Sequence, residues 1–163
     1  MSLTFNADEV YEMGEQIERN GRRFYQRAAK QTDSAEVRSL LLRLADMEAE
    51  HEKLFHNKRA KIAGSVPQVE YDPDDEVPRY LDAIVNGKIF ASLEDPSQKL
   101  TGKESDEAIL RMAVAAEKDS VVFYVGIREL VSKDLGGDQI DWLIGQELDH
   151  VADLVKQLNA LSG

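Results

Sequence analysis

Apolar side chains recur along the chain at the three- and four-residue spacing of amphipathic α-helices. This spacing predicts four long helices, which are separated by breaks containing glycine, proline or helix-capping residues. The predicted helices span residues 7–31, 34–63, 104–132 and 138–161. No segment alternates apolar and polar residues between turn signals, as a half-buried strand does. The pattern therefore predicts an all-α protein.

Short breaks join the predicted helices in pairs. Only two residues separate the first pair, and Asp33 or Ser34 can cap the second helix. Ser105 can cap the third helix, and Gly136 and Gly137 separate it from the fourth. Connections this short place consecutive helices side by side and antiparallel. Each pair is therefore expected to form a helical hairpin.

The stretch between the hairpins, residues 64–103, has a different composition. It contains all four prolines and the acidic run from Asp72 to Glu76. Pro78 is well placed to begin a short helix that ends near Gly87. A helix of about 25 residues is roughly 37 Å long, so this stretch is long enough to cross the whole bundle. We expect one domain over residues 1–163, an antiparallel four-helix bundle with a single long crossover containing a short helix.

Composition narrows the classes of function. The net charge of −11 disfavours binding to nucleic acid or to an anionic membrane surface and favours attraction of cations. The absence of cysteine excludes disulfides, thiolate nucleophiles and cysteine-ligated metals, so any metal needs oxygen and nitrogen ligands. Residues 1–10 lack a basic stretch followed by an apolar run, and no apolar segment approaches the roughly 20 residues that span a bilayer. A cytoplasmic protein is expected.

The second hairpin repeats the first at a displacement of 99 residues. In each half, 30 residues separate a helix glutamate from the glutamate of a Glu-x-x-His motif on the next helix. The superimposed pairs are Glu18 with Glu117, Glu48 with Glu147, His51 with His150, Phe24 with Phe123 and Tyr25 with Tyr124. The repeat thus preserves residues that can bind metal.

The spacing of these residues suits a site for two metal ions. Residues three apart lie on one face of a helix, so the glutamate and histidine of each motif can address the same site. A glutamate from the neighbouring helix of each hairpin completes a set of four carboxylates and two imidazoles. Four carboxylates nearly cancel the charge of two divalent cations, which offsets the cost of burying them. The predicted ligands are Glu18, Glu48, His51, Glu117, Glu147 and His150.

Ordinary explanations compete with each of these assignments. A single Glu-x-x-His motif is usually a solvated pair, but two motifs at equivalent places make coincidence improbable. His56 has no counterpart at position 155, so we expect a surface residue. Gly14 and Gly21 flank Glu18 and are expected to leave room near a metal. The remaining candidates are expected to be solvated charges: Glu15, Glu50, Glu52, Asp119 and Asp149.

Tyr25 and Tyr124 lie seven residues beyond their glutamates, about 10 Å along the same helix face. Most aromatic residues in this position are simply core residues. The alternative is that their phenol groups hydrogen-bond to metal-binding carboxylates, and such contacts orient the ligands and tune the metal.

The glutamate and Glu-x-x-His pattern resembles that of the ferritin-like superfamily, and more narrowly that of rubrerythrin-type di-iron proteins. The resemblance rests on Glu18, residues 48–51, Glu117 and residues 147–150, which are spread over all four predicted helices. It implies two bound iron ions, with manganese or zinc as alternatives. It further implies that Glu48 and Glu147 bridge the ions, that Glu18 and Glu117 are terminal ligands, and that each histidine binds one ion.

The sequence departs from rubrerythrins in two respects. Ser120 stands where these proteins typically carry a further carboxylate, so redox-linked movement of one iron between ligands is not carried over. A chain without cysteine also lacks their rubredoxin-like iron module, so electrons would come from a separate donor.

The resemblance implies a rubrerythrin-like peroxidase that reduces hydrogen peroxide or oxygen. Such an activity would give the protein a role in oxidative stress. The alternatives are a ferroxidase, an iron-binding or storage protein without peroxidase turnover, a dimanganese protein with catalase-like chemistry, and a structural bundle with a relic site. A homodimer is expected by analogy with other ferritin-like bundles.

Overall fold

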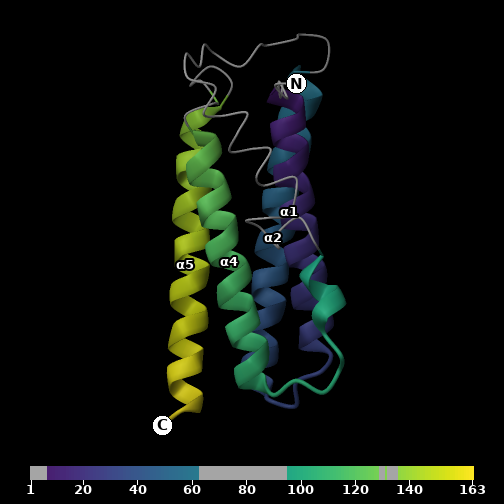
Figure 1. Cartoon of the computed structure of the whole chain (residues 1–163), viewed down its shortest axis with the longest axis vertical. Helices are drawn as coiled ribbons and strands as arrows, with labels where there is room; N and C mark the ends of the chain where they lie inside the picture. The colour runs from purple at the N-terminus through teal and green to yellow at the C-terminus, as the bar shows by residue number, and fades with distance from the viewer. Residues whose placement is uncertain (1–6, 63–94, 129–130, 132–135) are drawn as a thin grey trace, which may run out of the picture.

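The computed structural model describes residues 7–62, 95–128, 131 and 136–163 (Figure 1). Within these ranges the long elements are all α-helices, and there is no strand. The long helices are α1 (Ala7–Ala29), α2 (Ala35–Ile62), α4 (Asp106–Arg128) and α5 (Gly137–Leu161). The prediction of an all-α four-helix bundle is confirmed. The short helix expected after Pro78 lies outside the described residues.

Local signals in the sequence explain where the helices begin. The hydroxyl of Ser34 accepts a hydrogen bond from the backbone N–H of Val37 at 3.3 Å, and the hydroxyl of Ser105 accepts one from Ala108 at 3.2 Å. Both are N-cap contacts, which satisfy a backbone donor of the first turn. Gly136 precedes α5 with a φ of +107°, a conformation that favours glycine.

The helices are arranged as two antiparallel hairpins, α1 with α2 and α4 with α5 (Figure 1). Between the hairpins, α1 lies beside α4 and α2 lies beside α5. The end of α2 and the start of α4 lie at opposite ends of the bundle (Figure 1). The described end of the connection between them contains the short 3₁₀-helix η2 (Pro96–Lys99), which contacts α1. None of the described helices is long and apolar enough to cross a membrane.

The core consists of two apolar clusters, one toward each end of the bundle. One cluster includes Tyr11, Phe55 and Tyr124, and the other includes Phe24, Leu41 and Ile109. On each helix, the predicted metal-binding residues fall between the positions that supply the two clusters. The polar centre of the bundle is therefore closed off by apolar packing at both ends.

The outer side of the first hairpin carries a network of ion pairs. The carboxylate of Glu15 lies 2.7 Å from an Arg19 nitrogen and 3.0 Å from an Arg59 nitrogen, and Glu15 is only 6% exposed. The expectation that Glu15 is a solvated charge is wrong, because it faces the seam between α1 and α2. Burial opposes its ionised form, but Arg59 and Arg19 outweigh burial and lower its pKa. His56 is exposed at the rim of this network, as expected.

Gly14 was expected to leave room near a metal, and this expectation is wrong. The glycine instead makes room for a buried aromatic ring. A Cβ atom at Gly14 would lie 2.6 Å from Cε1 of Phe55. The Phe55 ring is fully buried and stacks on Tyr124 with the ring centroids 5.7 Å apart. Any side chain at position 14 would therefore displace an aromatic ring of the core.

Gly14→Ala is expected to lower the free energy of unfolding by about 1–2 kcal/mol, because the overpacking penalty exceeds the gain in helix propensity. Gly145 on α5 provides the matched control, since a Cβ atom there would meet nothing within 4 Å. Gly145→Ala should raise the free energy of unfolding by up to about 1 kcal/mol. Urea denaturation followed by circular dichroism measures both. Equal effects of the two substitutions would contradict this account of Gly14.

Candidate metal centre

The six predicted ligand residues converge at the centre of the bundle, and each is at most 3% exposed. They come from all four long helices: Glu18 from α1, Glu48 and His51 from α2, Glu117 from α4, and Glu147 and His150 from α5. Their ligand atoms form two overlapping groups, each within 4.8 Å. The first group is Glu18, Glu48, His51 and Glu147, and the second is Glu48, Glu117, Glu147 and His150.

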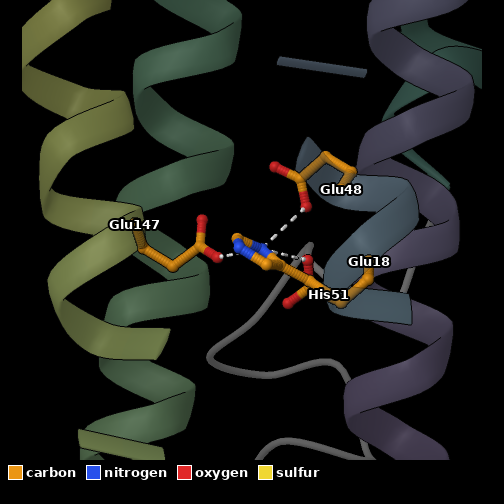
Figure 2. Close-up of side chains that lie close together, drawn as sticks. All are labelled: Glu18, Glu48, His51 and Glu147. Atoms are coloured by element: carbon orange, nitrogen blue, oxygen red, sulfur yellow. Dashed lines mark ion pairs between the residues drawn. The ribbon is translucent and has the colours of Figure 1, made fainter. Parts of the chain in front are cut away.

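The first group surrounds the imidazole of His51 (Figure 2). Its Nδ1 atom lies 3.1 Å from Oε1 of Glu147 and 3.3 Å from Oε2 of Glu18. Oε2 of Glu48 is 3.9 Å away. Glu147 reaches His51 from the other hairpin, so this group joins both halves of the repeat.

The second group surrounds His150 in the same way. Its Nδ1 atom lies 3.2 Å from Oε2 of Glu147 and 3.3 Å from Oε1 of Glu48. Oε1 of Glu117 is 3.4 Å away. Glu48 and Glu147 thus each direct one carboxylate oxygen toward each histidine, whereas Glu18 and Glu117 each belong to one group.

Two tyrosines form hydrogen bonds across the bundle to Glu18 and Glu117, the outer glutamates, each of which belongs to only one of the two groups. The phenol of Tyr25 on α1 donates a hydrogen bond to Glu117 on α4, and the phenol of Tyr124 on α4 donates one to Glu18 on α1. Because α1 and α4 run antiparallel, the same seven-residue spacing serves both contacts, and each tyrosine reaches the glutamate of the other helix. Burial, followed by the nearby glutamate charges, raises the pKa of both phenols well above its usual range, so they remain hydrogen-bond donors.

The two carboxylates shared between the groups resist ionisation. Burial raises the pKa of Glu48 well above its usual range, and the charges of Glu18 and Glu147 raise it further. Burial, together with the charges of Glu18 and Glu117, raises the pKa of Glu147 to about 8. Without a cation, both side chains therefore favour the protonated form, and Glu147 is mostly protonated at neutral pH.

The outer glutamates and the histidines form the charged part of the site. Burial opposes the ionised form of Glu18, but the groups around it, led by Glu48 and His51, outweigh burial and lower its pKa. Glu117 behaves likewise beside His150 and Glu147. Burial also opposes the charged imidazoles, yet the adjacent carboxylates raise the pKa of His51 to about 9 and that of His150 to about 10. Protons on the two imidazoles therefore offset the negative charges of Glu18 and Glu117.

These residues fit a cation. The buried side-chain atoms that make no hydrogen bond within the described chain include Nδ1 of His51, Nδ1 and Nε2 of His150, Oε2 of Glu18 and both oxygens of Glu147. Nδ1 of His51 and Nδ1 of His150 lie 3.1 and 3.2 Å from oxygens of Glu147 without forming a hydrogen bond. Buried polar atoms are nearly always satisfied in folded proteins. Converging atoms of this kind match the oxygen and nitrogen ligands of a metal such as iron, manganese or zinc.

The pattern of the sequence did not single out Trp142. Its ring lies edge-on to the His51 ring, with the centroids 5.6 Å apart, and the residue is 50% exposed. It lies outside the apolar face of α5 and has no counterpart in the repeat, where position 43 is Arg43. No signal in the sequence connects it to His51.

Glu48→Gln is expected to stabilise the metal-free protein by about 1–3 kcal/mol at pH 7. The folded pKa of Glu48 is raised above its unfolded value of 4.5, so wild-type stability falls as the pH rises from that value toward the folded pKa. The neutral amide removes this loss. Glu50→Gln is the matched control on an exposed position of the same helix and should change stability by less than about 0.5 kcal/mol. A metal-free E48Q protein less stable than wild type at pH 7 would refute the assignment.

The fold is similar to that of a protein described as a ferritin-like diiron-carboxylate protein from Thermotoga maritima. The two structures align with a TM-score of 0.66 over 96% of each chain, at 20% sequence identity. No protein-family model and no curated protein matches the sequence. A likeness at this identity shows the fold alone, so the narrower resemblance to rubrerythrins stays a prediction. The chain has a ferritin-like four-helix fold.

Proposed function

We propose that this chain is a di-iron oxidoreductase that reduces hydrogen peroxide or oxygen with electrons from a separate donor. One observation carries the proposal: Glu48 and Glu147 each direct one oxygen toward His51 and the other toward His150. This arrangement suits two ions held side by side by shared carboxylates. The structural relative from Thermotoga maritima is described as a diiron-carboxylate protein, which supports iron as the metal.

In this proposal, His51 and Glu18 would hold one ion, and His150 and Glu117 would hold the other, with Glu48 and Glu147 within reach of both. When bound, the iron pair supplies two electrons, one from each Fe(II). Reduction of hydrogen peroxide by two electrons and two protons yields two molecules of water. Manganese and zinc also bind such ligands, but zinc has no redox chemistry.

The surrounding residues of the chain support this chemistry. Tyr25 and Tyr124 hold the terminal glutamates by hydrogen bonds, and contacts of this kind orient metal ligands. The apolar clusters on both sides exclude water along the bundle axis. The chain contains no cysteine for an iron–sulfur module, so the electrons for each turnover come from another molecule.

Ferroxidase activity is the second candidate. It uses the same ions, with Fe(II) as substrate, and the net charge of −11 favours attraction of Fe(II) to the protein. In that case the product is an accumulating ferric mineral, and oxygen is the oxidant.

Stopped-flow oxidation of the anaerobically Fe(II)-loaded protein distinguishes these functions. The proposal expects oxidation by hydrogen peroxide to be at least about tenfold faster than by oxygen, and His51→Ala to slow it by at least about tenfold. His56→Ala is the matched control, because this histidine is exposed and lies outside the site. Faster oxidation by oxygen with accumulating mineral would favour ferroxidase, and inertness toward both oxidants would refute an oxidoreductase.

Metal binding near pH 7 is expected to release up to four protons. They come from His51, His150, Glu48 and Glu147, whose raised pKa values favour the protonated forms without metal. Because protons compete with the metal, affinity should increase as the pH rises from about 6 to 8. Isothermal titration calorimetry in buffers of different ionisation enthalpy measures the number of protons. Metal binding without proton release would contradict the charge state described for the site.

A further inference from the structure

A cavity of about 260 Å³ lies between α1 and α4, beside the carboxylates of Glu48 and Glu117. The part of its wall that is apolar comes from both helices and from η2. It consists of Ile17, Phe24, Met112, Ala115, Ala116 and Pro96. The cavity therefore extends from the candidate metal centre along an apolar wall.

Two small residues leave this space open. Gly21 and Ser120 occupy equivalent positions in the repeat, one turn after Glu18 and Glu117, and both line the cavity. A Cβ atom at Gly21 would lie only 3.3 Å from Cδ of Glu48. The hydroxyl of Ser120 donates a hydrogen bond to Ala116 in its own helix. Gly21 has no side chain and the side chain of Ser120 is small and bonded to its own helix, so both positions leave space beside the carboxylates.

The outer end of the cavity is polar and is formed partly by η2. Lys99 of η2 and Asp119 of α4 line this end, whereas Asn20 of α1 is a buried part of the lining. Arg27 of α1 holds the segment in place, because its guanidinium donates hydrogen bonds to the backbone oxygens of Ser97 and Leu100 at 3.0 and 2.9 Å. The cavity is thus built by packed elements of the fold.

We propose that this cavity binds a small, uncharged, mainly apolar organic molecule. An apolar cavity of about 150 Å³ accommodates benzene, so this one has room for a molecule of roughly ten non-hydrogen atoms. Peroxide and oxygen would fill only a small part of it. The apolar wall offers water few hydrogen-bond partners, so an apolar ligand replaces water favourably. The proposal goes beyond the reduction of peroxide or oxygen and requires no metal ion.

The charges around the cavity decide the class of ligand. Glu48 and Glu117 stand at the inner end and Asp119 at the outer end, so an anion would meet carboxylates at both ends. Among the described residues that line the cavity, Lys99 is the only basic one. A cation would lose its hydration against the apolar wall between the two ends. An uncharged molecule avoids both costs.

Methionine methyl NMR tests the proposal directly on the metal-free full-length chain. Met112 lines the cavity, whereas Met13, its counterpart in the repeat, and Met47 do not. Titration with indole should shift the ¹³C-methyl resonance of Met112 saturably and leave those of Met13 and Met47 in place. Indole-5-carboxylate, the anionic analogue, should bind at least about tenfold more weakly. An unmoved Met112 resonance, or equal binding of the two probes, would overturn the proposal.

Met112→Trp fills part of the cavity and should weaken indole binding at least about tenfold. Met13→Trp is the matched control and should leave the affinity unchanged. Circular dichroism shows whether each variant is folded. If a variant does not fold, the methyl titration of the wild-type protein remains the test of the proposal. Metal binding by Met112→Trp is measured separately and should persist, so failure of the cavity proposal is distinguishable from failure of the metal site. Undiminished indole binding by a folded Met112→Trp protein would overturn the proposal.

Discussion

Burial of four carboxylates and two imidazoles at one point is the constraint on which the rest of this structure depends. Isolated charges at this depth would cost more than the marginal stability of an ordinary domain. In the metal-free protein, the raised pKa values favour neutral Glu48 and Glu147 and positive histidines, and the lowered pKa values favour Glu18 and Glu117 as the balancing anions. Two divalent cations can take the place of these protons without changing the total charge, so the same residues suit both states.

The repeat explains how a chain of this size builds such a site. Each hairpin supplies one glutamate and one Glu-x-x-His motif, and the antiparallel packing of the hairpins brings both sets to the same level. The same geometry pairs each tyrosine with the glutamate of the opposite hairpin, so the polar centre links both halves. Apolar clusters at both ends supply the packing that the polar centre cannot.

Much of the fold could be predicted because helical periodicity, capping serines and an internal repeat are local properties of the sequence. The convergence of the six polar residues follows from the repeat, since equivalent positions of two packed hairpins meet. Properties that depend on tertiary packing could not be predicted in this way. Gly14 faces Phe55, Glu15 is buried beside Arg59, and Trp142 contacts His51, and none of these contacts has a periodic or paired signal. The cavity between α1 and α4 likewise depends on how two distant helices approach each other.

The most direct test of the two-metal centre is anomalous X-ray diffraction from crystals of the iron-loaded protein, measured at the iron absorption edge. The account predicts two anomalous peaks between the helices, one next to Nδ1 of His51 and the other next to Nδ1 of His150, with Glu48 and Glu147 in contact with both. A single peak, or peaks only at surface carboxylates, would contradict it.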